Sequence, residues 1–290
     1  MPESREILER LAQVDVRQPH GQHSASTVTR KPRLRRSVEP ARPWSLADVI
    51  IIALTLLLAG MVSSLVIGNR MAHLLPEIGV VWLRIVLLVL FYVIELGVLA
   101  LLAHRRKLPF VVAYRLRRLS DEERERIGQS SRPVQSARPL SAGKAIIAVV
   151  VVSLLLRLAA YGWTLLATNT LKWTMPQSQS MPFLFGRTAA GAVAALLIVG
   201  ILGPVIEELA FRVIIQEYFA ARVAVFLAAL ITAAIFAASH ISLWTAPLFL
   251  LLGLTTSWLA WRARTIWPAI AAHVVYNATI VLAAFYLLLK

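Results

Sequence analysis

Long apolar stretches separated by short polar breaks dominate the chain from residue 48 onward. Most of these stretches are long enough to cross a hydrocarbon layer of about 30 Å. They cover residues 48–68, 79–103, 143–168, 186–203, 223–240, 244–261 and 266–288. None alternates as a barrel strand does, and a backbone in lipid must satisfy its own hydrogen bonds, so all should be helices. The pattern predicts an all-α, polytopic transmembrane helix bundle of about seven spans.

Composition agrees with this fold class. Hydrophobic residues make up 58% of the 290 residues, charged residues only 16%, and the mean hydropathy is +0.71. A soluble domain of this length usually has a smaller fraction of hydrophobic residues. The chain contains no cysteine, which excludes a thiol nucleophile, cysteine-ligated zinc and a disulfide framework.

The net charge of +15 is concentrated in two segments, residues 1–44 and 105–141. Basic residues near span ends stay cytoplasmic, which predicts a cytoplasmic amino terminus and, with seven crossings, a carboxyl terminus outside. Such segments attract anionic headgroups, so membrane lipids are the expected partners. Nucleic acid is not expected, because no aromatic residues alternate with the arginines.

The same features predict the domain organisation. A disordered basic cytoplasmic tail (1–44) precedes a two-span hairpin (45–104), a basic cytoplasmic linker (105–141) and a helical core (142–290). In the linker, Ser120 followed by Glu123 is typical of a helix cap. The sequence does not indicate an oligomeric state.

The most unusual polar element is the adjacent pair Glu207 and Glu208 within an apolar stretch. An acidic side chain at a helix centre costs roughly 2.5 to 3.5 kcal/mol on insertion scales, so it is usually paired or functional. Positions four apart share a helix face, which predicts that Glu208 pairs with Arg212 while Glu207, over Phe211, stays free. Alternatively, Gly203-Pro204 ends a span, and both acids complement the dipole of the next helix.

Two further elements place polar groups on one helix face. Phe236 and His240 are four residues apart, as are His273 and Asn277. Taken singly, a boundary histidine or an asparagine between helices is common in membrane bundles. His273 and Asn277 together are harder to explain by packing alone.

Counting along the helices tests whether these groups can meet. If Arg222 marks the inner membrane interface, Glu207 and His240 lie about 22 and 27 Å above that interface, at a helix rise of about 1.5 Å per residue. His273 follows Arg264 by nine residues, only about 13 Å on the same scale. This count leaves His273 below the other two.

The ordered elements E-E-x-x-x-R, F-x-x-x-H and H-x-x-x-N over about residues 185–285 resemble the CPBP family of glutamic intramembrane proteases, which includes CAAX-processing and bacteriocin-immunity-type enzymes. The resemblance implies that Glu207, as general base, and His240 activate a water. It implies that His273 and Asn277 hold the oxyanion, with Glu208 and Arg212 as support. Val213 departs from the family, since many members have glycine there. The expected substrate is a hydrophobic or lipidated peptide, with no cofactor.

The residues leave other chemistry open. Ser239 next to His240 suggests a serine route, although adjacent helical positions point apart. Zinc held by Glu207, His240 and His273 is the main alternative to a metal-free site.

Two other classes of function also remain open. A proton-coupled transporter or a membrane scaffold would likewise use polar groups within spans. Arg84, Glu95 and Arg157 fit either class or a structural role.

Overall fold

The computed structural model describes residues 44–67, 77–117, 120, 139–173, 175 and 180–289. All belong to one compact unit, Glu39–Lys290. The tail predicted for residues 1–44, apart from Trp44, lies outside the described residues, as does residue 123 of the predicted linker cap. The main helices of the described part are α2 (Leu46–Ile67), α3 (Glu77–Arg105), α6 (Ala142–Leu165), α11 (Val225–Ser239), α12 (Ala246–Ala263) and α13 (Trp267–Leu289). Between α6 and α11 lies one further long helical segment, described below.

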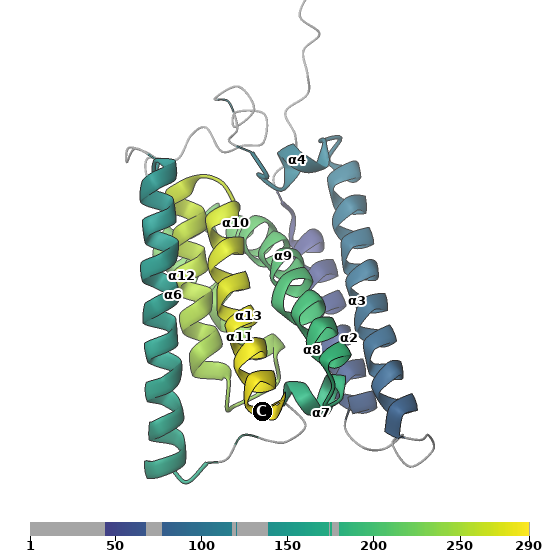
Figure 1. The fold of residues 1–290 in the computed structure, drawn as a ribbon. Coiled ribbons are helices and arrows are strands. Elements are labelled where there is room, and N and C mark those ends of the chain that lie inside the picture. Colours follow the sequence, from purple (N-terminus) through teal and green to yellow (C-terminus); the bar gives the residue numbers. More distant parts are fainter. Residues whose placement is uncertain are drawn as a thin grey trace, which may run out of the picture. The chain divides into compact units, whose positions relative to one another are not determined.

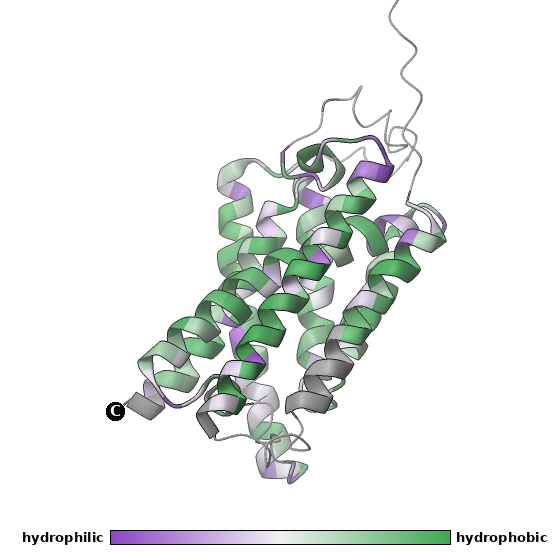
Figure 2. Cartoon of the chain, turned by 90° about the vertical axis from the view of Figure 1, so that its right-hand side faces the viewer, coloured by the Kyte–Doolittle hydropathy of each residue, from purple (hydrophilic) through white to green (hydrophobic). Residues whose placement is uncertain are grey.

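The described part of the chain is helical throughout its regular structure, which confirms the predicted all-α membrane bundle. The helical stretches long and apolar enough to cross a membrane are Gly79–Arg105, Ala142–Thr170, Ala189–Ala220 and Trp267–Tyr286. Figure 2 shows hydrophobic residues along most of the helix length, with hydrophilic residues mainly near the ends and a few midway. The count of seven spans stays a prediction.

One predicted boundary is wrong, because the fourth apolar stretch does not end at Gly203. The helix continues to Ala220 as α8 (Ala189–Ala195), η5 (Leu196–Leu202), α9 (Gly203–Glu208), η6 (Leu209–Ile215) and α10 (Gln216–Ala220), where η denotes π-helix. Proline lacks an N–H and clashes with the carbonyl four residues earlier in an α-helix. The wider i→i+5 turns of η5 accommodate Pro204 without a break.

Helix α9 packs against α3 on one side and α13 on the other, while α11 packs along α12 (Figure 1). Two glycines permit this closeness. A Cβ at Gly203 would lie 2.5 Å from the Tyr92 hydroxyl of α3, and one at Gly253 of α12 would lie 2.9 Å from Ala233 of α11. The close approach of α9 to α3 and of α11 to α12 positions the helices that carry the polar residues Glu207 and His240.

Short helix α4 (Phe110–Ala113) and the residues after it join several helix ends. Arg115 forms an ion pair with Glu217 and donates to the Ala260 carbonyl at 3.1 Å. The Trp267 indole N–H donates to the Leu116 carbonyl at 2.6 Å. The first part of the predicted linker is therefore held against α10, α12 and α13.

Candidate active site

Glu208 is bonded on both carboxylate oxygens. Its Oε2 accepts a hydrogen bond from Arg212 Nε at 2.9 Å, as the four-residue spacing predicts. Its Oε1 lies 2.9 Å from His273 Nδ1. Arg212 in turn donates from Nη1 to Ser257 Oγ at 3.0 Å. The side chains of Glu208, Arg212 and His273 have no exposed surface, so this is a fully buried network joining α9, η6, α12 and α13.

The bond from Glu208 to His273 and the contribution of Ser257 were not predicted. Both join residues distant in sequence, at separations of 65 and 45 positions. A serine in an apolar helix carries no signal beyond mild polarity, since it usually bonds to its own backbone. Only the packing of α13 against α9 and of α12 against η6 reveals these partners.

Glu207 differs from its neighbour. Its Oε2 is buried and has no hydrogen-bond partner, and the same is true of His273 Nε2. These two atoms are 3.8 Å apart, and His240 Nε2 lies 4.0 Å from the same carboxylate oxygen. The side chains of Glu207 and His240 are 16% and 25% exposed. Three polar atoms therefore converge without bonding to one another.

The remaining ring nitrogens define the histidine tautomers. His240 Nδ1 lies 2.8 Å from the Phe236 carbonyl, which can only accept, so Nδ1 carries the proton. His273 Nδ1 likewise faces a carboxylate oxygen of Glu208. In the neutral form, each ring presents an unprotonated Nε2 toward Glu207.

Phe236 fixes both rings in place. It packs edge-on against His240 and His273, with centroid distances of 4.8 and 5.6 Å, and against Phe211 at 5.0 Å. Phe249 of α12 stacks on His240 at 3.8 Å. These contacts restrict the imidazole orientations and keep the surroundings apolar.

Asn277 lies one turn after His273 on α13. Its amide Nδ2 donates to the Val199 carbonyl of η5 at 3.0 Å, which leaves one amide hydrogen for another acceptor. Within the described part of the chain, Asn277 forms no hydrogen bond to Glu207 or to either histidine. Its hydrogen bond to Val199 joins α13 to the helix that carries Glu207.

The height count that left His273 below Glu207 is wrong. The two side chains meet, with Glu207 Oε2 3.8 Å from His273 Nε2. The π-helical turns of η6 account for part of the difference in height, because each takes more residues than the α-helical turns assumed in the count. Fewer turns therefore separate Glu207 from Arg222 than the uniform 1.5 Å rise implies. A regular hydropathy pattern gives no sign of this shortening.

Ser239 does not form a nucleophile pair with His240. Its Oγ donates to the Phe236 carbonyl at 2.8 Å and lies 3.5 Å from His240 Nδ1, away from the Nε2 that faces Glu207. Among the described residues, no group of three or more His, Asp or Glu side chains is arranged to hold a metal ion.

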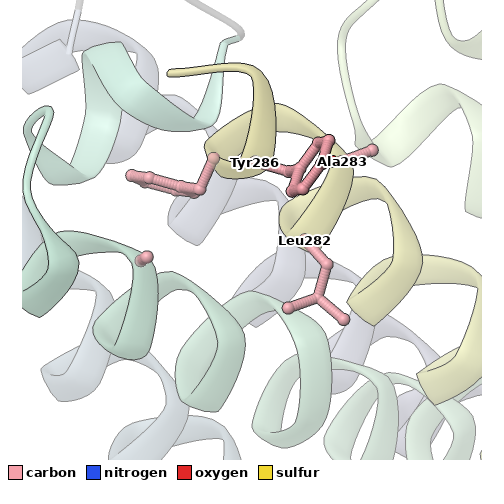
Figure 3. Close-up of a pocket in the computed structure, with 5 residues that line it drawn as sticks. Leu282, Ala283 and Tyr286 are labelled. Atoms are coloured by element: carbon pink, nitrogen blue, oxygen red, sulfur yellow. The ribbon is translucent and has the colours of Figure 1, made fainter. Parts of the chain in front are cut away.

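An open recess of about 480 Å³ lies elsewhere, between α8 and the end of α13 (Figure 3). Its lining is almost wholly apolar. It is formed by Ala192, Leu282, Ala283, Phe285 and Tyr286. None of the polar groups described above reaches it, so it does not belong to this site.

Comparison with known proteins points to one family. Residues 189–279 match the family model described as type II CAAX prenyl endopeptidase Rce1-like. Over 92 residues the chain is 36% identical to a Bacillus subtilis (strain 168) protein named "Putative membrane peptidase YdiL". That alignment covers 31% of the chain and spans 38% of the relative's length. No solved structure gives a significant match.

The matched region contains the residues on which the sequence motifs rest. Glu207, His240, His273 and Asn277 all lie within residues 189–279. The two helices α2 and α3 and helix α6 lie before it. The resemblance to the CPBP family is thereby confirmed: this region is similar to the Rce1-like type II CAAX prenyl endopeptidases.

Proposed function

We propose that this protein is an intramembrane endopeptidase that hydrolyses peptide bonds with a water activated by Glu207 and His240. One observation carries the proposal: Glu207 Oε2 and His273 Nε2 are both buried without a hydrogen-bond partner and lie 3.8 Å apart, beside His240 Nε2. Buried polar atoms in native proteins nearly always have partners. A set of such atoms converging on one point is typical of a site that binds a polar reactant.

The separations suit a nucleophilic water. Polar atoms about 4 Å apart can both bind one water oxygen at about 2.8 Å. Glu207 takes one proton from this water as its oxygen forms a bond to the scissile carbonyl carbon, while the other hydrogen stays on that oxygen and donates to His240 Nε2. The tetrahedral intermediate then re-forms the carbonyl and breaks the C–N bond, and the leaving amine takes the proton held by Glu207. No covalent enzyme intermediate is required.

The oxyanion role belongs to His273 and Asn277. Asn277 has one amide hydrogen left for this purpose. His273 already directs Nδ1 at Glu208, so it donates from Nε2 only when both nitrogens carry protons. Donors held in position at a developing oxyanion contribute about 10²- to 10³-fold to the rate. Glu208 and Arg212 support His273, and Phe236 orients both rings.

The substrate class follows from the surroundings. The site lies within apolar helices, and the partly exposed side chains are those of Glu207 and His240. A hydrophobic or lipidated peptide reaches such a site from the bilayer, whereas a soluble peptide pays a desolvation cost. The family model is named for CAAX prenyl endopeptidases, which agrees with a lipidated peptide.

We also propose that the amino terminus is cytoplasmic. Arg115 joins the ends of α10 and α12, and α4 just before it contacts α3. The ends of α3, α10 and α12 all carry basic residues. They are Arg105, Arg106, Lys107, Arg222, Arg262 and Arg264. Basic residues near span ends favour the cytoplasmic side. A protease-accessibility assay on sealed vesicles tests this orientation.

The function is tested by incubating the purified protein with a pooled library of membrane and prenylated peptides. Wild type is compared with Glu207→Gln and His240→Ala, each with and without a zinc chelator. Cleavage by wild type that both substitutions abolish and the chelator leaves unchanged supports the proposal.

The other outcomes separate the alternatives. Chelator-sensitive cleavage would indicate zinc bound by Glu207, His240 and His273. Cleavage that survives both substitutions would remove this site from the reaction. Absence of cleavage by well-folded wild type would favour a transporter or a scaffold.

A further inference from the structure

Glu95 is a second buried carboxyl group that the proposed reaction does not use. It lies in the middle of α3, outside the matched region 189–279, and is 2% exposed. Its Oε2 has no hydrogen-bond partner, and among the described residues it forms no ion pair. An acidic side chain at a helix centre is costly in a membrane, and packing alone would favour an apolar residue there.

Helices α3 and α9 place Glu95 near Glu207. The two helices pack together and run in the same direction, α3 toward α4 and α9 toward α10 (Figure 1). The Tyr92 hydroxyl lies against Gly203, so the face of α3 that carries Tyr92 is turned toward α9. Glu95 follows Tyr92 by three residues and Glu207 follows Gly203 by four, so both lie about one turn further on. Glu95 and Glu207 also interact electrostatically.

Other charged groups near α3 are engaged elsewhere. Asp48 of α2 accepts hydrogen bonds from Ser45 and lies near Arg105. Glu208 is bound to Arg212 and His273. Arg84 of α3 lies three turns from Glu95 and donates to the Phe183 carbonyl. Helices α4, α7 (Met181–Phe185) and η5 carry no titratable side chain. Glu207 and Tyr92 are therefore the titratable groups with which Glu95 interacts.

We infer that Glu95 is a positioning residue for Glu207, holding its carboxylate from the α3 side through a carboxyl–carboxylate contact with one proton between them. This inference rests on the proposed function, because it assigns Glu207 as the base. Two ionised carboxylates in an apolar site repel, so a contact between them contains one proton. That proton lets Glu95 donate to Glu207 and leaves the opposite Glu207 oxygen free for water and the histidines.

The inference predicts opposite effects on stability and activity. Glu95→Met replaces a buried carboxyl group, which is costly at the centre of an apolar helix, with an apolar side chain of similar length, so the free energy of unfolding should stay unchanged or rise. The same change removes the contact with Glu207. Displacing a catalytic group by about 1 Å costs about 10²-fold. We therefore expect kcat to fall by about that factor, with KM unchanged.

Glu95→Gln is the matched control. Glutamine has the length of glutamate and a neutral donor group, so it replaces the protonated carboxyl in the contact. Most of the wild-type kcat should remain. A role confined to packing would not distinguish Gln from Met in this way.

The experiment measures kcat, KM and detergent unfolding for wild type, Glu95→Met, Glu95→Gln and Glu207→Gln, with a peptide that wild type cleaves in the library. Low kcat in the Met variant, unchanged stability and rescue by Gln support the inference. Wild-type kcat in Glu95→Met, a parallel loss of stability and kcat, or failure of Gln to rescue each overturn it. Cleavage by Glu207→Gln would instead refute the proposed function.

Discussion

The two glutamates of the candidate active site contrast in how well their carboxylate oxygens are satisfied. On one side, Glu208 binds Arg212 and His273 and is fully buried. On the other, Glu207 and His240 are partly exposed, and the Glu207 oxygen nearest the histidines has no partner. The two glutamates are adjacent in sequence, yet helix geometry directs them into different surroundings.

This difference teaches which residue holds the structure and which is available to react. A buried charge needs bonded partners, and removing one partner is strongly destabilising. A group that binds a reactant must keep an atom free of hydrogen bonds within the protein. Buried polar atoms without partners are therefore expected at functional sites. We therefore expect substitutions on the Glu208 side to affect stability and those on the Glu207 side to affect activity.

Glu207→Gln tests the contrast with the largest expected effect. Removing a general base lowers the rate by about 10²- to 10⁴-fold. The free energy of unfolding should hardly change, because the lost oxygen has no hydrogen-bond partner. Peptidase kinetics and detergent unfolding of the same preparation measure both. A large loss of stability would contradict the division between the two sides.

Glu208→Gln should mainly destabilise the fold. Removing one partner of a buried ion pair costs about 3 to 5 kcal/mol, since Arg212 would keep an uncompensated charge. Denaturant titration in detergent measures the loss. The double variant Glu208→Gln with Arg212→Met is the control, because it removes both charges and should recover part of the stability. No recovery would show that the ion pair is not the cause.

Phe249→Leu should weaken activity more than stability. The stacked contact with His240 is worth about 0.5 to 1.5 kcal/mol beyond area burial. Leucine keeps much of the apolar volume but does not hold the imidazole plane, and about tenfold in kcat corresponds to 1.4 kcal/mol. Kinetics with one cleavable peptide test this. Unchanged kcat would show that Phe236 alone orients His240.

Ser257→Ala should give the smallest effect. It removes the hydrogen bond from Arg212 Nη1, and a typical bond of this kind contributes about 1 kcal/mol to stability. Activity should change little, because Glu208 still binds both Arg212 and His273. A loss of activity comparable with that of Glu207→Gln would show that the buried network reaches the reaction directly.

Most of the helix pattern was predictable from hydropathy. The apolar stretches correspond to α2, α3, α6, α8 with η5, α11, α12 and α13. The end at residue 203 was wrong, because proline predicts a break only for regular α-helix and π-helical turns accommodate it. The sequence contains no hydropathy signal for such turns.

The candidate site was partly predictable for a physical reason. Polar residues are costly in apolar helices, so Glu207, His240 and His273 stood out against their surroundings. Their partners did not, because the bond between Glu208 and His273 depends on how α9 and α13 pack. Ser257 and Glu95 needed the same tertiary information. The catalytic roles of all these residues stay predictions.

The π-helical segments on both sides of α9 make the local helix geometry matter at this site. Each segment contains a wide turn that holds more residues than an α-helical turn. A substitution in η5 that let this turn return to α-helix at unchanged chain length would rotate everything after it by about 100°, the angle of one residue in an α-helix. Glu207 would then turn away from His273 although no active-site residue had changed. Deleting one residue together with the wide turn would instead keep the direction of Glu207, because the deleted residue is the one that the wide turn holds in excess.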